Sequence, residues 1–151
     1  MLWLHELRVG SPLHYATIGW CLAAMAAFAL WGRALESPRK ERRLRRAWVV
    51  VMGALSAVVL SIAFHPRNFD ARYSLPLHLC DVAILVAGVA LWTRNRLART
   101  LTYFWTLGLS TQAFLTPVVA AGPAHLEYWF FWILHVQVVG AAVYDLVVHG
   151  Y

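Results

Sequence analysis

The sequence predicts an all-α fold: a polytopic integral membrane helix bundle of five transmembrane helices, with residues 1–151 forming one domain. Three observations lead to this prediction. The chain is 61% hydrophobic and 13% charged, whereas about a quarter of the residues of a soluble domain are charged. The apolar residues gather in five stretches, close to the ~20 residues that a spanning helix needs. The basic residues gather between these stretches.

The expected spans are, in order, 13–35, 47–64, 75–92, 100–118 and 126–148. The loops between them are short and basic or polar, and none is long enough to separate two domains. The second span carries only Ser56 and Ser61 as polar residues, so we expect it to contribute least to a site. The other four spans each carry polar side chains that need an explanation.

The basic residues predict the orientation in the membrane. Ten of the thirteen Lys and Arg residues lie in two loops, 33–46 and 94–99, which fall on the same side of the expected bundle. Because Lys and Arg concentrate in cytoplasmic loops, the N-terminus is expected outside and the C-terminus in the cytoplasm. The net charge of +6 is thereby explained by topology. Nucleic acid is therefore excluded as the expected partner.

The third span begins with the densest group of reactive side chains, in the run Leu75-Pro76-Leu77-His78-Leu79-Cys80-Asp81. Ionisable groups are costly in hydrocarbon, and those found there usually face the bundle interior and mark a site. On a regular helix His78 and Asp81 would share a face, while Cys80 would point about 160° away from His78. A base for Cys80 is therefore expected from another helix.

Polar side chains of several spans share a depth. At a rise of about 1.5 Å per residue they fall within roughly 15 Å of the outer boundary. These residues are His14, His78, Cys80, Asp81, Gln112, Thr116 and His135. On the fourth span Gln112 and Thr116 share a stripe with Gly108, which is typical of a helix contact or a cavity wall. We therefore expect an outer-half polar pocket built from spans one, three, four and five.

Two interpretations of Cys80 stay open. A thiolate is nucleophilic and a nearby histidine can take the thiol proton, so Cys80 with His135 or His14 suits acyl transfer to or from lipids. In that mechanism Gln112 would donate to the oxyanion and Asp81 would orient His78. In the other interpretation Cys80 is a small apolar filler, as most buried cysteines are, and residue spacing alone favours this second interpretation.

The histidines allow other chemistry. Three histidines with Asp81 would suit a zinc ion that activates water, but no HExxH or equivalent spacing is present. Two histidines on different helices would suit haem, but no span carries a pair at haem spacing. We therefore expect no metal and no cofactor. Arg67 and Arg72, before the third span, are candidates to contact a phosphate headgroup.

Several of these residues also carry a family resemblance. They are the run LPLHLCD at 75–81, TRN at 93–95, YFW at 103–105, Gln112 with LTP at 115–117, His135, and SPLH at 11–14. Over most of the chain, from Ser11 to Tyr151, the sequence resembles the YwaF-like bacterial integral membrane proteins. The resemblance implies a multi-pass protein of the bacterial cytoplasmic membrane. Members of that family run on for about two more spans. The resemblance therefore implies either a truncated member that lacks about two C-terminal spans or a short member closed by self-association into a homo-oligomer.

The resemblance also implies a function. Eukaryotic relatives of that family look like acyltransferases that move fatty acyl chains between phospholipids with a membrane cysteine, a role that falls here on Cys80. The leading hypothesis is therefore a cysteine-dependent lipid acyltransferase or acyl hydrolase whose partners are membrane phospholipids. The alternative is a non-catalytic small-ligand binder or transporter component, in which the same polar groups hold a small ligand. A metal-dependent membrane hydrolase is the third hypothesis.

Overall fold

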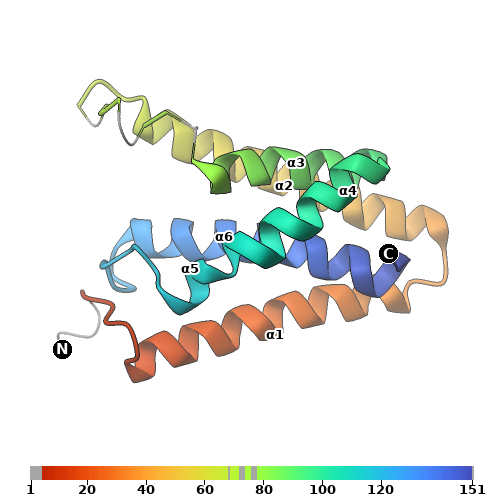
Figure 1. The fold of residues 1–151 in the computed structure, drawn as a ribbon, viewed down its shortest axis with the longest axis horizontal. Coiled ribbons are helices and arrows are strands. Elements are labelled where there is room, and N and C mark those ends of the chain that lie inside the picture. The colour runs from red at the N-terminus through yellow and green to blue at the C-terminus, as the bar shows by residue number, and fades with distance from the viewer. Residues whose placement is uncertain (1–4, 68, 72–73, 76–77, 151) are drawn as a thin grey trace.

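The computed structural model describes residues 5–67, 69–71, 74–75 and 78–150. Within these ranges the chain forms helices and one isolated antiparallel β-bridge, between Glu6 and Ala121, and it contains no strand. The prediction of an all-α fold is confirmed. The helices run back and forth along one direction, with α6 in the middle, α1 on one side of it and α2 with α3 on the other (Figure 1).

Three helices are long and apolar enough to cross a membrane: α1 (Pro12–Ala34), α2 (Pro38–Ala63) and α6 (Leu126–His149). The expected first and fifth spans match α1 and α6 to within about a residue at each end. Helix α1 starts where the Ser11 hydroxyl accepts the backbone N–H of His14 at 3.2 Å. Such a cap satisfies one of the N–H groups that every helix start leaves unpaired.

Helix α2 begins well before the expected second span. It starts at Pro38 instead of residue 47, so most of the basic segment taken for a loop is helical. Proline is favoured in the first helical turn, and Glu41 in that turn interacts favourably with the helix dipole. Glu41 also pairs with Arg45 one turn later, at 3.0 Å. The basic residues therefore extend the spanning helix instead of separating it from its neighbour.

Helix α3 (Leu79–Thr93) is shorter than the expected third span, which began at Leu75. His78 is extended, with φ −66° and ψ 147°, and lies outside the helix as its N-cap. The Asp81 carboxylate accepts the backbone N–H of His78 at 3.2 Å, which fixes this start. The prediction that His78 and Asp81 share a helical face is therefore wrong.

The fourth expected span is divided into three helices. They are α4 (Arg96–Thr102), the π-helix η2 (Tyr103–Ser110) and α5 (Gln112–Leu115). In η2 the turns are wider, as shown by the bond from the Thr111 N–H to the Thr106 carbonyl five residues earlier, at 3.1 Å. A π segment changes which residues share a face, and this matters for the site described below.

Helix α6 packs against α1 on one side and against α3, η2 and α2 on the other. Two apolar clusters result. One lies between α1, α5 and α6 and is built around Cys21, Met25, Phe114, Trp132 and Val139. The other lies between α2, α3 and α6 and is built around Met52, Ala87, Leu91, Val138 and Tyr144. Helix α2 keeps most of its apolar surface exposed, since little of its most apolar window is buried inside the protein.

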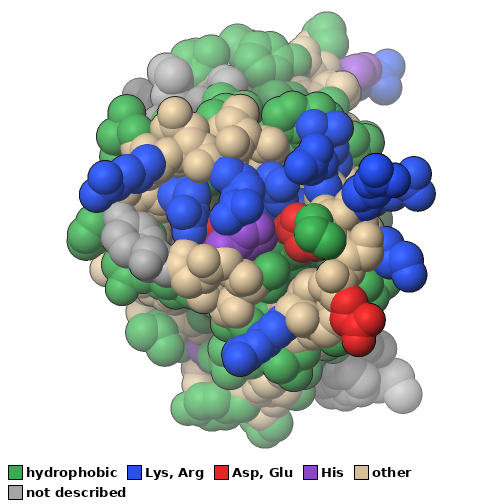
Figure 2. Space-filling view, turned by 90° about the vertical axis from the view of Figure 1, so that its right-hand side faces the viewer, with side chains coloured by type: hydrophobic (Ala, Val, Ile, Leu, Met, Phe, Trp, Pro, Cys, Tyr) green, Lys and Arg blue, Asp and Glu red, His purple; other side chains and the backbone are tan. Residues whose placement is uncertain are grey.

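The end of the bundle where α2 and α4 start holds a connected set of charges. The Glu41 carboxylate accepts bonds from Arg45 at 3.0 Å and from the Tyr144 hydroxyl at 3.1 Å, and His149 lies 3.3 Å away. Beside it Arg99 pairs with Asp145 at 2.6 Å. Figure 2 looks onto this end and shows Lys and Arg side chains around a histidine, with acidic side chains among them. We call these five residues and Asp145 the inner network.

Candidate functional site

Cys80 lies in the first turn of α3 and is partly buried. The Ser110 hydroxyl at the end of η2 and the Asp81 carboxylate both lie close enough to this thiol to act on it electrostatically. Ser110 is buried, and its hydroxyl also lies 3.4 Å from the Trp105 carbonyl. In the described part of the chain the polar neighbours of Cys80 are therefore a hydroxyl and a carboxylate, and no imidazole bonds to it.

Asp81 connects Cys80 to the rest of the site. Its carboxylate caps α3 through the His78 N–H and lines a small cavity between α2, α3 and α6. Its charge acts on His135 of α6 as well as on Cys80. The Asp81 carboxylate thus binds the backbone N–H of His78, while the His78 side chain faces the Asp81 backbone N–H in the same capping box. The expected bond from the Asp81 carboxylate to the His78 imidazole is not formed among the described residues. His78 itself is exposed.

His135 is held with one nitrogen free. Its Nδ1 lies 2.7 Å from the Phe131 carbonyl one turn earlier, and because a carbonyl only accepts, Nδ1 carries the proton. Nε2 then keeps a lone pair, which is what a proton acceptor requires. The ring packs against Phe131, with centroids 4.3 Å apart, and against Phe114. This arrangement favours His135 over the other histidines as a base.

His14 has both ring nitrogens engaged. Its Nδ1 accepts the Gly10 N–H at 3.0 Å, and its Nε2 donates to the Phe114 carbonyl at 2.9 Å. The side chain is 3% exposed and its ring packs against Trp132. It therefore joins the start of α1 to α5, and no nitrogen is left for the expected proton relay.

Gln112 and Thr116 face the other way from the prediction. Both are exposed, and the Thr116 hydroxyl bonds to the Gln112 carbonyl at 3.2 Å. The expected interior stripe of Gly108, Gln112 and Thr116 is wrong, because the wide turns of η2 rotate it outward. The buried positions on this segment recur every four residues instead: Thr102, Thr106, Ser110 and Phe114. The recurrence of Thr102, Thr106 and Ser110 every four residues is the feature of the sequence that indicates a buried Ser110.

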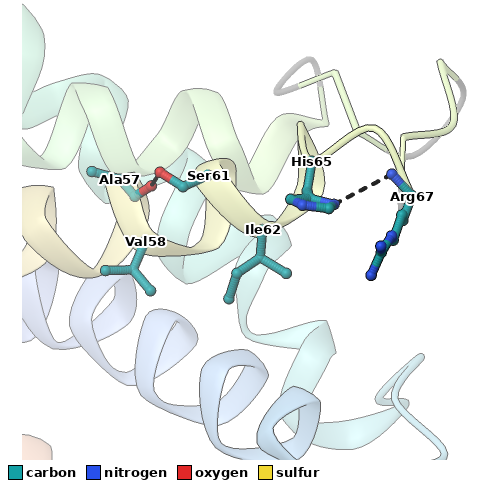
Figure 3. Close-up of a pocket in the computed structure, with 6 residues that line it drawn as sticks. All are labelled: Ala57, Val58, Ser61, Ile62, His65 and Arg67. Atoms are coloured by element: carbon teal, nitrogen blue, oxygen red, sulfur yellow. Dashed lines mark hydrogen bonds between the residues drawn. The ribbon is translucent and has the colours of Figure 1, made fainter.

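A broad hollow of about 630 Å³ lies at the end of α2 near the site. It is lined by Ala57, Val58, Ser61, Ile62, His65 and Arg67, and Figure 3 shows them on the last turns of α2 and the loop that follows. The Arg67 N–H lies 3.3 Å from His65 Nδ1. This places one of the two candidate headgroup ligands beside an apolar surface. The other candidate, Arg72, lies outside the described residues.

The metal hypothesis finds no ligand set in the part of the chain that the structure describes. No three His, Cys, Asp or Glu side chains gather there in a way that could hold one ion. The residues that the structure does bring together are Cys80, Asp81, Ser110 and His135, with Asp81 interacting with both Cys80 and His135.

Residues 9–151, which are nearly the whole chain and include all of these side chains, match the model of the TMEM164 family. The chain belongs to the TMEM164 family. The resemblance to the YwaF-like proteins is therefore wrong as an assignment, since the match over nearly the whole chain is to a different family. What that resemblance implied about activity carries no weight, and a function has to be argued from the side chains.

This TMEM164-family chain is also similar to an uncharacterized protein of Treponema pallidum (strain Nichols). The two are 28% identical over 141 residues, which make up 93% of this chain and 58% of the relative. The chain thus spans less than two thirds of the length of that relative. No solved structure matches it.

Proposed function

We propose that this chain is a membrane-embedded acyltransferase or acyl hydrolase that uses Cys80 as its nucleophile and membrane phospholipids as substrates. The observation that supports this proposal most strongly is the position of the thiol at one end of an apolar helix, next to the Ser110 hydroxyl and to Asp81, whose charge also acts on His135. Ionisable groups that gather in an apolar helix bundle are typical of functional sites. The proposal rests on this geometry and not on a relative of known activity.

The reaction needs two steps. In the first, the Cys80 sulfur attacks an acyl ester carbonyl, a carbon–sulfur bond forms, and the ester carbon–oxygen bond breaks. The thiol proton passes to a base and from there to the leaving alcohol, which is a lysophospholipid. In the second step a hydroxyl of an acceptor lipid attacks the thioester, which transfers the acyl group and restores the thiol. Water in place of the acceptor gives hydrolysis.

Each neighbour of Cys80 has a role in this scheme. The Ser110 hydroxyl is the group that donates to the oxyanion as the carbonyl becomes tetrahedral, a role that Gln112 on the exposed face does not fill. His135 accepts the proton at Nε2, the nitrogen left free by its bond to Phe131. The Asp81 carboxylate stabilises the imidazolium that results, since its charge already acts on that ring.

We also propose the membrane arrangement in which this chemistry takes place. The chain crosses a bacterial cytoplasmic membrane five times as one domain, with α3 and the α4–η2–α5 segment as the two crossings beyond the three long helices. The antiparallel course of the helices and the gathering of basic side chains at one end support an outer N-terminus and a cytoplasmic C-terminus (Figures 1 and 2). The Cys80 site then faces the outer leaflet, with Arg67 near its headgroups.

The decisive experiment compares the two cysteines. The full chain is reconstituted in phosphatidylcholine liposomes with a lysophospholipid acceptor, and acyl exchange is followed by mass spectrometry of the lipids. Cys80→Ala is expected to lower turnover on the order of 10³-fold or more, as for the loss of other nucleophiles. Cys21→Ala is the matched control, because Cys21 is fully buried in the apolar cluster between α1 and α6. Unchanged turnover in Cys80→Ala would end the proposal.

A non-catalytic ligand binder remains the second candidate, and one observation favours it. The Ser56 hydroxyl, in the cavity that Asp81 also lines, is buried and has no hydrogen-bond partner in the described part of the chain. A ligand could therefore bind there without using the thiol. This alternative predicts that Cys80→Ser retains all function while Asp81→Asn removes it. The acyltransferase proposal predicts a loss in Cys80→Ser as well.

A further inference from the structure

A small cavity of about 120 Å³ lies between α2, α3 and α6, beside the Cys80 site. It is lined by Ser56, Val59, Leu60, Asp81, Ile84, Leu85 and Leu134. Two of these side chains are polar. Asp81 caps α3, and the Ser56 hydroxyl is buried with no hydrogen-bond partner among the residues that the structure describes. A buried polar group without a partner is unfavourable, so this hydroxyl identifies a place where a ligand atom can bind.

The cavity adjoins a longer groove between α2 and α3. This groove has a volume of about 460 Å³ and shares Ser56, Leu60, Ile84 and Leu85 with the cavity. From there it extends along both helices to Trp92 and Thr93. Between Asp81 and Trp92 the helix rises about 17 Å at ~1.5 Å per residue. Beyond Ser56, nearly all of its lining is apolar.

We propose that the cavity and the adjoining groove together bind one acyl chain of a phospholipid, with the ester at Ser56 and Asp81 and the hydrocarbon tail between α2 and α3. This inference rests on the proposed function, because it names where the substrate of Cys80 lies. An ester carbonyl accepts a hydrogen bond and would satisfy the Ser56 hydroxyl. Asp81 lines the cavity and is close enough to Cys80 for its charge to act on the thiol, so an ester bound there lies near the nucleophile.

The polarity of the groove supports an acyl chain over other occupants. A second copy of this chain would have to insert a ridge of side chains into the groove and would leave the Ser56 hydroxyl without a partner. A small polar ligand would fill the end with Ser56 and Asp81 but would leave the long apolar part empty. A lipid chain carries one polar group at one end of a long apolar body, which matches both parts.

Gly53 keeps the groove open. A Cβ atom added at this position would meet no other atom within 4 Å, and Gly53 lines the groove on the α2 side. Gly53→Leu therefore adds bulk at the groove wall, at a position where its Cβ has room. The chain offers a matched control, because Gly19 of α1 has equally open surroundings and lines neither cavity.

The test uses phosphatidylcholine with a photoreactive diazirine in its acyl chain, mixed into liposomes that hold the full chain. After illumination, labelled residues are mapped by mass spectrometry. Labels concentrated on the groove residues of α2 and α3, above those on exposed α1 residues such as Leu22 and Leu30, would support the inference. Equal labelling of all exposed apolar residues would overturn it, since that is the pattern of bulk lipid. Cross-links between two copies through the groove would overturn it as well.

The variants then test the groove itself. Gly53→Leu is expected to lower groove labelling on the order of tenfold, while Gly19→Leu leaves it unchanged. Unreduced labelling in a folded Gly53→Leu variant contradicts the inference. If that variant fails to fold, the labelling pattern of the unaltered chain decides by itself.

Cys80→Ala separates this inference from the proposed function. Groove labelling should persist in this variant, because binding of the chain does not need the thiol. Labelling that persists together with unchanged turnover would remove the catalytic proposal and leave the groove as a lipid site. Turnover that depends on Cys80 together with uniform labelling would remove only the groove.

Discussion

The two ends of the helix bundle differ in the groups that bind their carboxylates. At the inner network the Glu41 carboxylate accepts bonds from Arg45 and Tyr144, and a second carboxylate pairs with an arginine. At the Cys80 site the Asp81 carboxylate bonds to a backbone N–H, and within the described residues no Lys or Arg pairs with it. One end neutralises its carboxylates with cations, and the other leaves a carboxylate near a thiol and an imidazole.

Because of this difference, we expect substitutions at the two ends to affect different properties, the stability of the fold at one end and the reaction at the other. Removing one partner of a buried ion pair destabilises the fold strongly, because the other charge is left buried without a partner. A carboxylate without a cation can stabilise positive charge that forms during a reaction, such as the imidazolium of His135. The inner network is therefore expected to affect unfolding, and the Cys80 site to affect turnover.

The largest effect on stability is expected from Glu41→Ala. It leaves the guanidinium of Arg45, whose side chain is 6% exposed, without its carboxylate. We expect the free energy of unfolding to fall by about 3 kcal/mol, as for other broken buried pairs. Thermal unfolding in detergent measures this. Glu36→Ala, at an exposed position between α1 and α2, is the control and should change stability by less than about 0.5 kcal/mol. Equal effects would mean that the inner network does not stabilise the fold.

Ser110→Ala should show the opposite pattern. We expect turnover to fall on the order of 10²-fold, because the hydroxyl beside Cys80 no longer donates to the oxyanion. Stability should change by about 1 kcal/mol, the usual value for one hydrogen bond. Gln112→Ala is the control on the same segment, and its turnover should not change because Gln112 is exposed. A larger loss in Gln112→Ala than in Ser110→Ala would restore the role first predicted for Gln112.

His14→Phe tests whether the buried histidine of α1 belongs to the site or to the fold. The change removes the bonds to Gly10 and Phe114 and leaves a buried carbonyl unpaired. We expect about 2 kcal/mol of destabilisation. Turnover per folded molecule should stay unchanged, which liposome assays normalised to folded protein measure. A loss of turnover with unchanged stability would instead favour the proton relay.

The sequence predicted the regular parts of this fold well. Apolar length alone located α1 and α6, because a long hydrophobic run has few alternatives to a helix. The sequence-based prediction failed where a local feature, and not the mean hydropathy of the segment, decides where a helix starts. The basic run after Pro38 is helical because nothing in it breaks a helix, although its charges suggested a loop. Helix α3 starts late because Asp81 caps it through His78.

The residues of the candidate site could also be predicted only in part from the sequence. Cys80, Asp81 and His135 were found because ionisable side chains are conspicuous in apolar helices. Ser110 was missed and Gln112 was chosen, because both choices assumed regular α-helical turns through a segment that forms a π-helix. A hydroxyl in an apolar helix is also a weaker indication of a site than an amide, since Ser and Thr can hydrogen-bond to carbonyl groups of their own helix.

The smallest effect is expected where two neutral side chains bond across α1 and α6. The Thr17 hydroxyl lies 2.5 Å from the hydroxyl of Tyr128, and it also donates to the Leu13 carbonyl at 2.8 Å. Thr17→Val keeps the shape and should cost about 1 kcal/mol in unfolding free energy. Tyr128→Phe should cost about the same, and the double variant should cost less than the sum because both changes remove one bond. Strict additivity would show that the two hydroxyls do not interact, so that apolar packing is what holds α1 against α6 at this point.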